Sequence, residues 1–169
     1  MEFEQLYQEL ARGAEVVQAL VAGMPPGEAR FRPAPDVWSV LEVICHLYDE
    51  EREDFRQRLD IILHRPDQPW PPIDPAGWVT ARNYQARDLA EMLDSFLAER
   101  TQSLIWLRGL STPNWDAVYT ARFGPITAGD MFAAWVAHDA LHLRQLVELK
   151  WAKVVSLATP YKVQYAGDW

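Results

Sequence analysis

The chain has 169 residues, of which 49% are hydrophobic and 24% charged, and its formal net charge is -8. This length suits one core, so we expect residues 1–169 to form a single domain. The acidic balance has the wrong sign for a protein that follows a phosphate backbone, which excludes nucleic acid as an expected partner. The single cysteine, Cys45, excludes both an internal disulfide framework and a cluster of thiolates around zinc.

The N-terminal residues do not resemble a secretory signal. Met1-Glu-Phe-Glu-Gln carries acids where such a signal carries basic residues, and no apolar run approaches the length of a membrane span. The only lysines, Lys150, Lys153 and Lys162, do not form a polybasic cluster that would bind a membrane surface. We therefore expect a cytoplasmic protein with no membrane partner.

The first half of the chain predicts two amphipathic helices. Apolar residues recur at three- and four-residue spacing from Phe3 to Val21, and Pro and Gly then predict an extended connection from Met24 to Pro35. Ser39-Val-Leu-Glu42 is a capping box that begins a second helix, which runs to about Leu63. One face of this helix is a polar row in which the acids are expected to be solvated: Ser39, Glu42, His46, Glu50 and Glu53.

The second half predicts two more helices. Residues 66–78 contain five prolines and predict a long crossover, with Trp70 and Trp78 packed against the body. A third helix is expected from about Ala81 or Asp88 to Arg108. Residues 109–120 fit either an extended pair or a simple loop. Thr127-Ala-Gly-Asp130 predicts the start of a last helix to about Lys150, followed from Val154 by a non-helical tail packed on the body.

This pattern predicts an all-α fold, a four-helix bundle with a proline-rich crossover between the second and third helices. Bundles of this kind build metal sites from side chains on facing helices. His138 and His142 are four residues apart and share one helix face, so both imidazoles can reach one ion. The alternative is that they are ordinary helix residues. A third ligand has to come from another helix, and mid-helix His46 suits this better than His64, which a helix C-terminus explains.

Several motifs resemble the DinB-like family over nearly the whole chain. Val37-Trp-Ser leads into the helix that carries His46, and Thr127-Ala-Gly-Asp-Met-Phe precedes His138-x-x-x-His142-Leu-Arg-Gln145. The resemblance implies that His46, His138 and His142 bind a divalent metal. The family usually carries another His or a Gly near the last motif, where this chain has Leu141 and Leu143, a departure that removes no ligand.

The resemblance also implies an up-down-down-up bundle, frequently a homodimer, whose members include metal-dependent thiol S-transferases or isomerases that use low-molecular-weight bacterial thiols. Three imidazoles suit zinc, nickel, iron and copper alike, and we expect zinc or nickel. Such an ion can lower the pKa of a coordinated water to about 7 or ionise a coordinated thiol, so hydrolysis is as available as thiol transfer to a small-molecule substrate. A bundle that only dimerises or binds a partner is the non-catalytic alternative.

Two neighbours of the predicted ligands are candidates for catalytic roles. Glu50 lies one helical turn beyond His46, where it could accept an imidazole N–H, act as a general base or be a fourth ligand; the alternative is a solvated acid. Gln145 lies three residues beyond His142 and could bind a substrate or a water. Trp135 and Cys45 are expected to be core residues rather than parts of the site.

Overall fold

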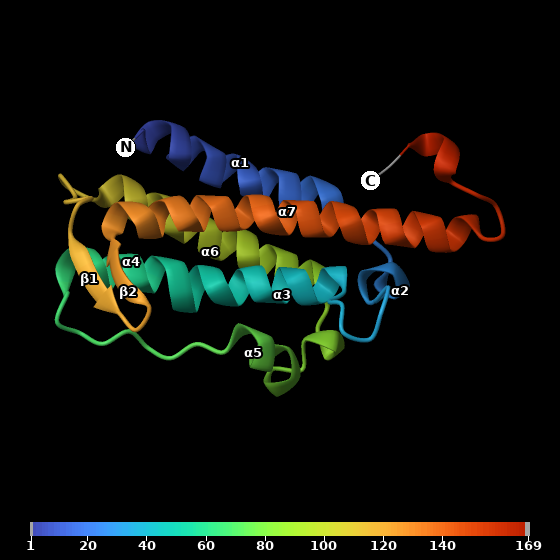
Figure 1. The fold of residues 1–169 in the computed structure, drawn as a ribbon, viewed down its shortest axis with the longest axis horizontal. Helices are drawn as coiled ribbons and strands as arrows, with labels where there is room; N and C mark the ends of the chain where they lie inside the picture. The colour runs from blue at the N-terminus through green and yellow to red at the C-terminus, as the bar shows by residue number, and fades with distance from the viewer. Residues whose placement is uncertain (1, 168–169) are drawn as a thin grey trace.

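Four long helical rods pack lengthwise against one another (Figure 1) in the computed structural model, which describes residues 2–167. The first rod is α1 (Phe3–Val21), the third is α6 (Leu89–Gly109) and the fourth is α7 (Ala128–Ala158). The second rod is a continuous composite of α3 (Val40–Glu50), the π-helical turn η1 (Glu51–Phe55) and α4 (Arg56–His64). The prediction of a mainly helical bundle is confirmed.

Two capping boxes begin the rods that carry the three histidines. At α3, Glu42 Oε2 accepts the Ser39 backbone N–H at 2.8 Å, while Ser39 Oγ accepts from the Glu42 N–H at 3.4 Å. Thr127 and Asp130 make the same exchange at α7. The expectation that Glu42 is solvated is wrong: it is 0% exposed, because the cap and an ion pair with Arg32 satisfy its carboxylate.

Three connecting segments contain more regular structure than the sequence predicts. The connection after α1 includes the short helix α2 (Pro26–Ala29), in which a proline at the first position fits a helix start. The crossover includes α5 (Pro75–Ala81), capped by Asp74, and the 3₁₀ turn η2 (Tyr84–Ala86). Residues 109–120, which fit either an extended pair or a loop in the sequence, lead into an antiparallel hairpin of β1 (Val118–Ala121) and β2 (Gly124–Thr127).

The crossover between α4 and α6 runs along the bundle in Figure 1, so the end of α4 and the start of α6 lie at opposite ends of the molecule. Its aromatic residues hold it in place. Trp70 stacks on Tyr119 of the hairpin with the ring centroids 4.4 Å apart, and the Arg82 guanidinium lies over the Trp78 ring. Both tryptophans are partly buried, as the sequence predicts.

The last helix is longer than predicted, and the tail beyond it does not pack as predicted. Helix α7 continues past Lys150 to Ala158 and projects beyond the other rods in Figure 1, followed by the 3₁₀ turn η3 (Gln164–Ala166). Tyr161 and Tyr165 are exposed. Residues 168 and 169 lie outside the described part of the chain. Within residues 2–167, no helix combines the length and apolar composition needed to cross a membrane.

A buried polar layer divides the hydrophobic core into two clusters. One cluster contains Val17, Ile44 and Phe96, and the other contains Leu59, Leu107 and Phe132. On three rods a buried charged residue lies between the two sets of apolar residues: Glu51 on the second, Arg100 on the third and Asp139 on the fourth. On α1 the same level is occupied by Gly13, which lies between Leu10 of one cluster and Ala14 of the other.

Helix α1 approaches α7 so closely at Gly13 that a side chain there has no room. A Cβ atom added to Gly13 would lie 2.3 Å from Asp139 Oδ2 and 3.2 Å from its Cγ. The Asp139 carboxylate cannot swing away without losing its bonds to Arg100. The contact between the first and fourth rods therefore requires glycine at this position.

We predict that Gly13→Ala destabilises the protein by about 1–3 kcal/mol, the usual cost of overpacking a well-packed site. The measurement is the free energy of unfolding in denaturant. The matched control is Gly109→Ala, where nothing lies within 4 Å of the added Cβ. Alanine's higher helix propensity makes that control neutral or stabilising by up to about 1 kcal/mol. Equal effects of the two substitutions would contradict the close approach.

Candidate metal centre

The structure brings the three predicted histidine ligands together from two rods. His46 projects from α3, and His138 and His142 project from successive turns of α7. Their Nε2 atoms form a triangle with sides of 3.0 Å between His138 and His142, 3.1 Å between His46 and His142, and 3.4 Å between His46 and His138. His46 is 5% exposed, whereas His138 and His142 are only partly buried, so the two ligands from α7 are the more exposed members of the triangle.

Burial keeps all three imidazoles in the neutral form that binds metals. It lowers the pKa of His46 to about 3 and that of His138 to about 2, and the neighbouring imidazoles add to both effects. The pKa of His142 is also lowered by burial. A protonated imidazole would lose its hydration here and meet two other nitrogen atoms. The lone pairs are therefore available at any physiological pH.

The triangle fits a first-row divalent ion. Tetrahedral zinc with Zn–N bonds of 2.0–2.1 Å holds its nitrogen ligands about 3.3–3.4 Å apart, close to the observed separations. Hydrogen bonding alone does not account for the arrangement. Each neutral imidazole carries a single N–H, so three Nε2 atoms that all face one another cannot all be satisfied as donor and acceptor pairs. A cation at this point satisfies all three lone pairs.

Gln145 fixes the orientation of one of these imidazoles. Its Oε1 lies 2.7 Å from His142 Nδ1. Because an amide oxygen only accepts, Nδ1 donates, and the His142 lone pair is on Nε2, toward the other two rings. Hydrogen bonds of this kind set the tautomer of metal-binding histidines. The structure thus places Gln145 against a predicted ligand, on the Nδ1 edge of the His142 ring.

Glu50 is buried beside His46, so the reading of Glu50 as a solvated acid is wrong. Its side chain is 5% exposed and its Oε1 lies 4.0 Å from His46 Nδ1. Among the described residues neither atom has a hydrogen-bond partner. Burial and the neighbouring Asp54 carboxyl raise the pKa of Glu50 to about 8. A small movement would let Glu50 accept the His46 N–H, which would direct the His46 lone pair to Nε2.

Three buried charged residues next to the histidines were not predicted from the sequence: Glu51, Arg100 and Asp139. They form one ion-paired group, and Asp139 directly follows His138. For Arg100, the spacing of apolar residues in the third helix does indicate a buried position. Arg100 follows Leu89, Leu93 and Phe96 at the three- and four-residue spacing of core positions, where a charge requires a buried partner.

The other candidate residues lie away from the triangle. His64 is on the surface at the end of α4, where its Nδ1 lies 2.8 Å from Asp60. Cys45 is fully buried, and burial raises the pKa of its thiol to about 12. Trp135 is 1% exposed and belongs to the core. These outcomes agree with the sequence-based expectations.

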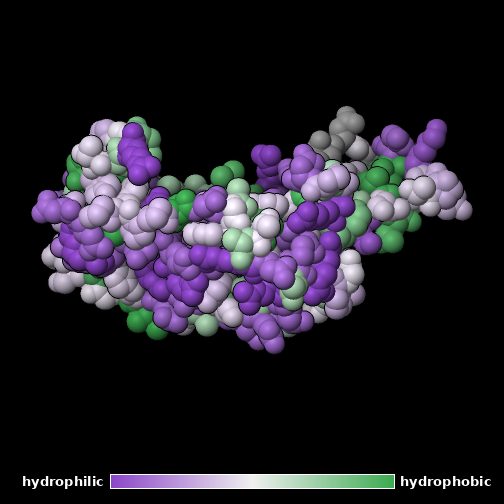
Figure 2. Space-filling model, turned by 90° about the horizontal axis from the view of Figure 1, so that it is seen from below, coloured by the Kyte–Doolittle hydropathy of each residue, from purple (hydrophilic) through white to green (hydrophobic). Residues whose placement is uncertain are grey.

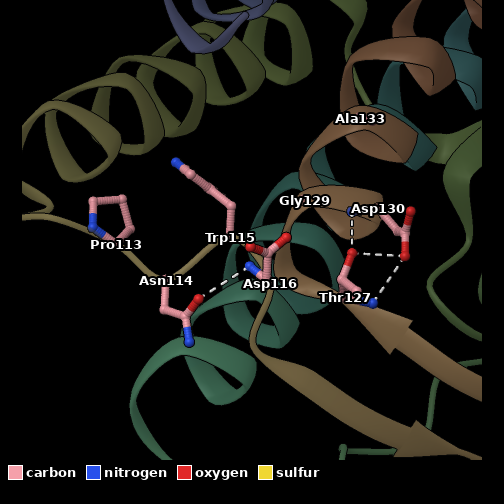
Figure 3. Close-up of a pocket in the computed structure, with 8 residues that line it drawn as sticks. All are labelled: Pro113, Asn114, Trp115, Asp116, Thr127, Gly129, Asp130 and Ala133. Atoms are coloured by element: carbon pink, nitrogen blue, oxygen red, sulfur yellow. Dashed lines mark hydrogen bonds between the residues drawn. The ribbon is translucent and has the colours of Figure 1, made fainter. Parts of the chain in front are cut away.

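A cavity of about 450 Å³ lies at the start of α7 and contains none of the histidines. Figure 3 shows Asn114, Trp115 and Asp116 on one side of it and Thr127 and Asp130 on the other. The polar groups there largely satisfy one another: Asp130 accepts from Thr127, and Asn114 Oδ1 accepts from the Asp116 backbone N–H. This cavity is therefore not a part of the metal centre.

Comparison with known proteins agrees with this description. No curated protein sequence matches the chain. The solved structure of YfiT from Bacillus subtilis, described as a probable metal-dependent hydrolase with an unusual four-helix bundle topology, superposes with a TM-score of 0.76 at 18% sequence identity. The superposition covers 86% of this chain and 84% of YfiT, which establishes a shared fold. Residues 9–146 match the model of the DinB superfamily, and the chain belongs to that superfamily.

Proposed function

We propose that this protein is a metal-dependent enzyme that delivers a small nucleophile to a small-molecule electrophile. The Nε2 triangle of His46, His138 and His142 carries the proposal, because it has the ligand type, protonation state and spacing of a three-histidine site for zinc or nickel. A divalent ion held there supplies the positive charge that ionises a coordinated water or thiol near neutral pH. The description of YfiT supports hydrolysis, and the family resemblance supports thiol S-transfer.

The exposure of the site favours an enzyme over a structural clip. Structural sites surround their ion with four protein ligands, whereas catalytic sites use three and leave a position open. Here three imidazoles converge, and two of them are only partly buried. The partial exposure of His138 and His142 supports an approach for substrate on the α7 side. The directions of the rods in Figure 1 support the up-down-down-up order of the family.

Glu50 and Gln145 are the chain's own groups for holding this site in a reactive state. Gln145 orients His142 through its Nδ1–H. Glu50 is placed to orient His46 in the same way, or to take the proton released when the nucleophile ionises. A carboxyl whose pKa is raised toward neutrality suits an acceptor that must give the proton up again.

A homodimer is supported by the part of the chain beyond the superfamily match. Residues 154–165 contain five exposed large hydrophobic side chains: Val154, Val155, Leu157, Tyr161 and Tyr165. All three lysines lie in residues 149–167, which contain no acid, so this projecting end is basic and the rest of the chain is more acidic than the total of -8. Hydrophobic residues can be seen at this end in Figure 2. We propose that it packs on a second copy of the chain.

The first prediction from this proposal concerns metal content. We expect protein purified without chelator or nickel resin to contain about one divalent ion per chain by elemental mass spectrometry, and His138→Ala to contain almost none. His64→Ala is the matched control, since His64 lies on the surface beside Asp60, and it keeps the wild-type metal content. A wild-type content near zero that zinc or nickel salts cannot raise contradicts the proposal.

Activity decides between the two nucleophiles. The metal-loaded protein is assayed on a panel of activated esters and amides, and separately on an electrophilic aromatic halide with bacterial thiols. Turnover without thiol indicates hydrolysis, and turnover that depends on thiol indicates S-transfer. We expect His138→Ala to abolish whichever activity is found. An activity that survives this substitution and metal removal does not come from the proposed site.

The second prediction uses the raised pKa of Glu50 in metal-free protein. The folded state holds the Glu50 proton up to about pH 8, whereas the unfolded chain releases it near the ordinary pKa of 4.5. The folded state binds more protons in this window, so Glu50 makes stability fall as pH rises. Glu50→Gln removes this loss. The free energy of unfolding of Glu50→Gln, relative to that of the wild type, therefore increases as pH rises from about 5 to about 8.5.

Glu53→Gln is the control for this pH series. Arg82 lowers the pKa of Glu53, so Glu53 stays ionised in both the folded and unfolded states over most of this range and adds no slope. The series is measured by urea unfolding of chelator-treated protein. If wild type and Glu50→Gln keep a constant difference across the series, Glu50 is not protonated in the folded protein at neutral pH.

The third prediction concerns the dimer. We expect sedimentation velocity of the full chain to show a dimer. Leu157→Glu puts a charge on a 70% exposed leucine of the projecting end, and we expect this variant to be a monomer. The control Ile105→Glu changes a residue of similar exposure, 68%, on α6 and leaves the dimer intact. A monomeric wild type, or a dimer that only Ile105→Glu breaks, refutes the proposed surface.

A further inference from the structure

Arg100 is a buried cation that bonds to all three other rods of the bundle. It is 2% exposed, and all five of its N–H groups have acceptors. Nε and Nη2 donate to the two carboxylate oxygens of Glu51 at 2.8 and 2.9 Å, on the second rod. Nη1 and Nη2 donate to Asp139 on α7 at 2.6 and 2.9 Å, and Nη1 also donates to the Leu10 carbonyl of α1 at 2.7 Å. Because every N–H of the Arg100 guanidinium donates to a fixed acceptor, the guanidinium can take only one orientation among its partners.

This network is joined to the candidate metal ligands through packed rings. Glu51 Oε2 also accepts the Trp135 indole N–H at 2.9 Å. Trp135 stacks on Phe55 with the ring planes 7° apart, and the Phe55 ring centroid lies 4.8 Å from that of His138. Asp139 is the residue after His138 on the same helix. The network thus contacts α7 and the second rod directly beside the candidate metal ligands.

Two consecutive acids at the start of the π-helical turn have different partners. Glu50 and Glu51 are 4% and 2% exposed, yet Glu50 faces His46 and Glu51 faces Arg100. A π turn places an extra residue in one helical turn, which shifts the residues that follow it around the axis. The π turn begins at Glu51, so it sets the directions of the residues that follow, and Phe55 and Leu59 belong to the hydrophobic core.

We propose that the Glu51–Arg100–Asp139 network is a positioning device for the metal centre, which sets the separation between His46 on α3 and the His138–His142 pair on α7. The inference rests on the proposed metal binding. Two bidentate carboxylates fix a guanidinium in direction and distance, whereas apolar contacts of the same area tolerate repacking. A metal site needs its ligands held within about 0.5 Å of the productive geometry. Glu51, Arg100 and Asp139 are thus positioning residues, and none of them is among the three histidines that would hold the ion.

The test measures metal affinity, independently of catalysis. Glu51→Gln keeps the size of the side chain and removes one charge from the fork. Zinc affinity is measured by competition with a chromophoric chelator, and the cobalt-loaded protein gives a visible spectrum that reports ligand geometry. We expect zinc affinity to fall about tenfold or more, as for outer partners of metal ligands, and the cobalt bands to shift or weaken. Metal-free Glu51→Gln should keep its helical circular dichroism.

Glu42→Gln is the matched control. Like Glu51, Glu42 is a buried carboxylate of the second rod that pairs with an arginine. Its partner Arg32, however, precedes α3 and does not bond to α7. We expect this variant to lose stability and keep the wild-type zinc affinity and cobalt spectrum. If Glu51→Gln does not fold, Asp139→Asn replaces it, since it weakens the fork from the α7 side.

The possible outcomes distinguish a positioning role of the network from a purely structural one. A folded Glu51→Gln or Asp139→Asn with wild-type affinity and spectrum overturns the positioning role and leaves the proposed metal site standing. Equal losses of affinity in Glu42→Gln and Glu51→Gln overturn it as well, because they would reflect stability alone. If neither network variant folds even in excess zinc, the network is only a structural requirement. A wild type that takes up neither zinc nor cobalt overturns both this inference and the proposed function.

Discussion

The structure depends on the need of one buried arginine for partners. A guanidinium removed from water is tolerated only where every donor finds an acceptor, and the acceptors of Arg100 come from α1, the second rod and α7. The hydrophobic clusters on either side of this layer are less selective, because apolar surfaces can slide. The polar layer therefore fixes the longitudinal register of the four rods, and the glycine at position 13 lets α1 come close enough to take part.

The candidate metal centre uses the same level of the bundle. The histidines stand where the apolar packing is interrupted, so their imidazoles are dry enough to stay neutral while two of them still meet solvent. Adjacent residues on the same helices thus serve different purposes, one stabilising the core and the other contributing to the candidate site. Glu51 and Asp139 face Arg100, whereas their neighbours in the chain belong to the site: His138 is part of the triangle, and Glu50 lies beside His46.

The sequence was sufficient for the features that depend on local chemistry. The caps at Ser39 and Thr127 and the turn-to-turn pair His138 and His142 are short-range patterns, and each has the predicted structure. The π turn could not be predicted, because it depends on which rods Glu50 and Glu51 meet. Helix α5 was missed because the prolines around it dominate the local signal, although Asp74-Pro75 is a legitimate helix start. The continuation of α7 beyond Lys150 could not be predicted from hydrophobic periodicity, because its apolar residues, including Val154, Val155 and Leu157, are exposed and form no buried stripe.

Helix α7 runs without a break for 31 residues, about 46 Å at 1.5 Å per residue. Its first turn closes the hairpin, its middle carries His138 and His142, and its last turns leave the body. A straight helix transmits force along its axis because it has no joint at which to bend. A surface that packs on the projecting end would therefore bind the same continuous helix that carries two of the three imidazoles, while the third lies on α3.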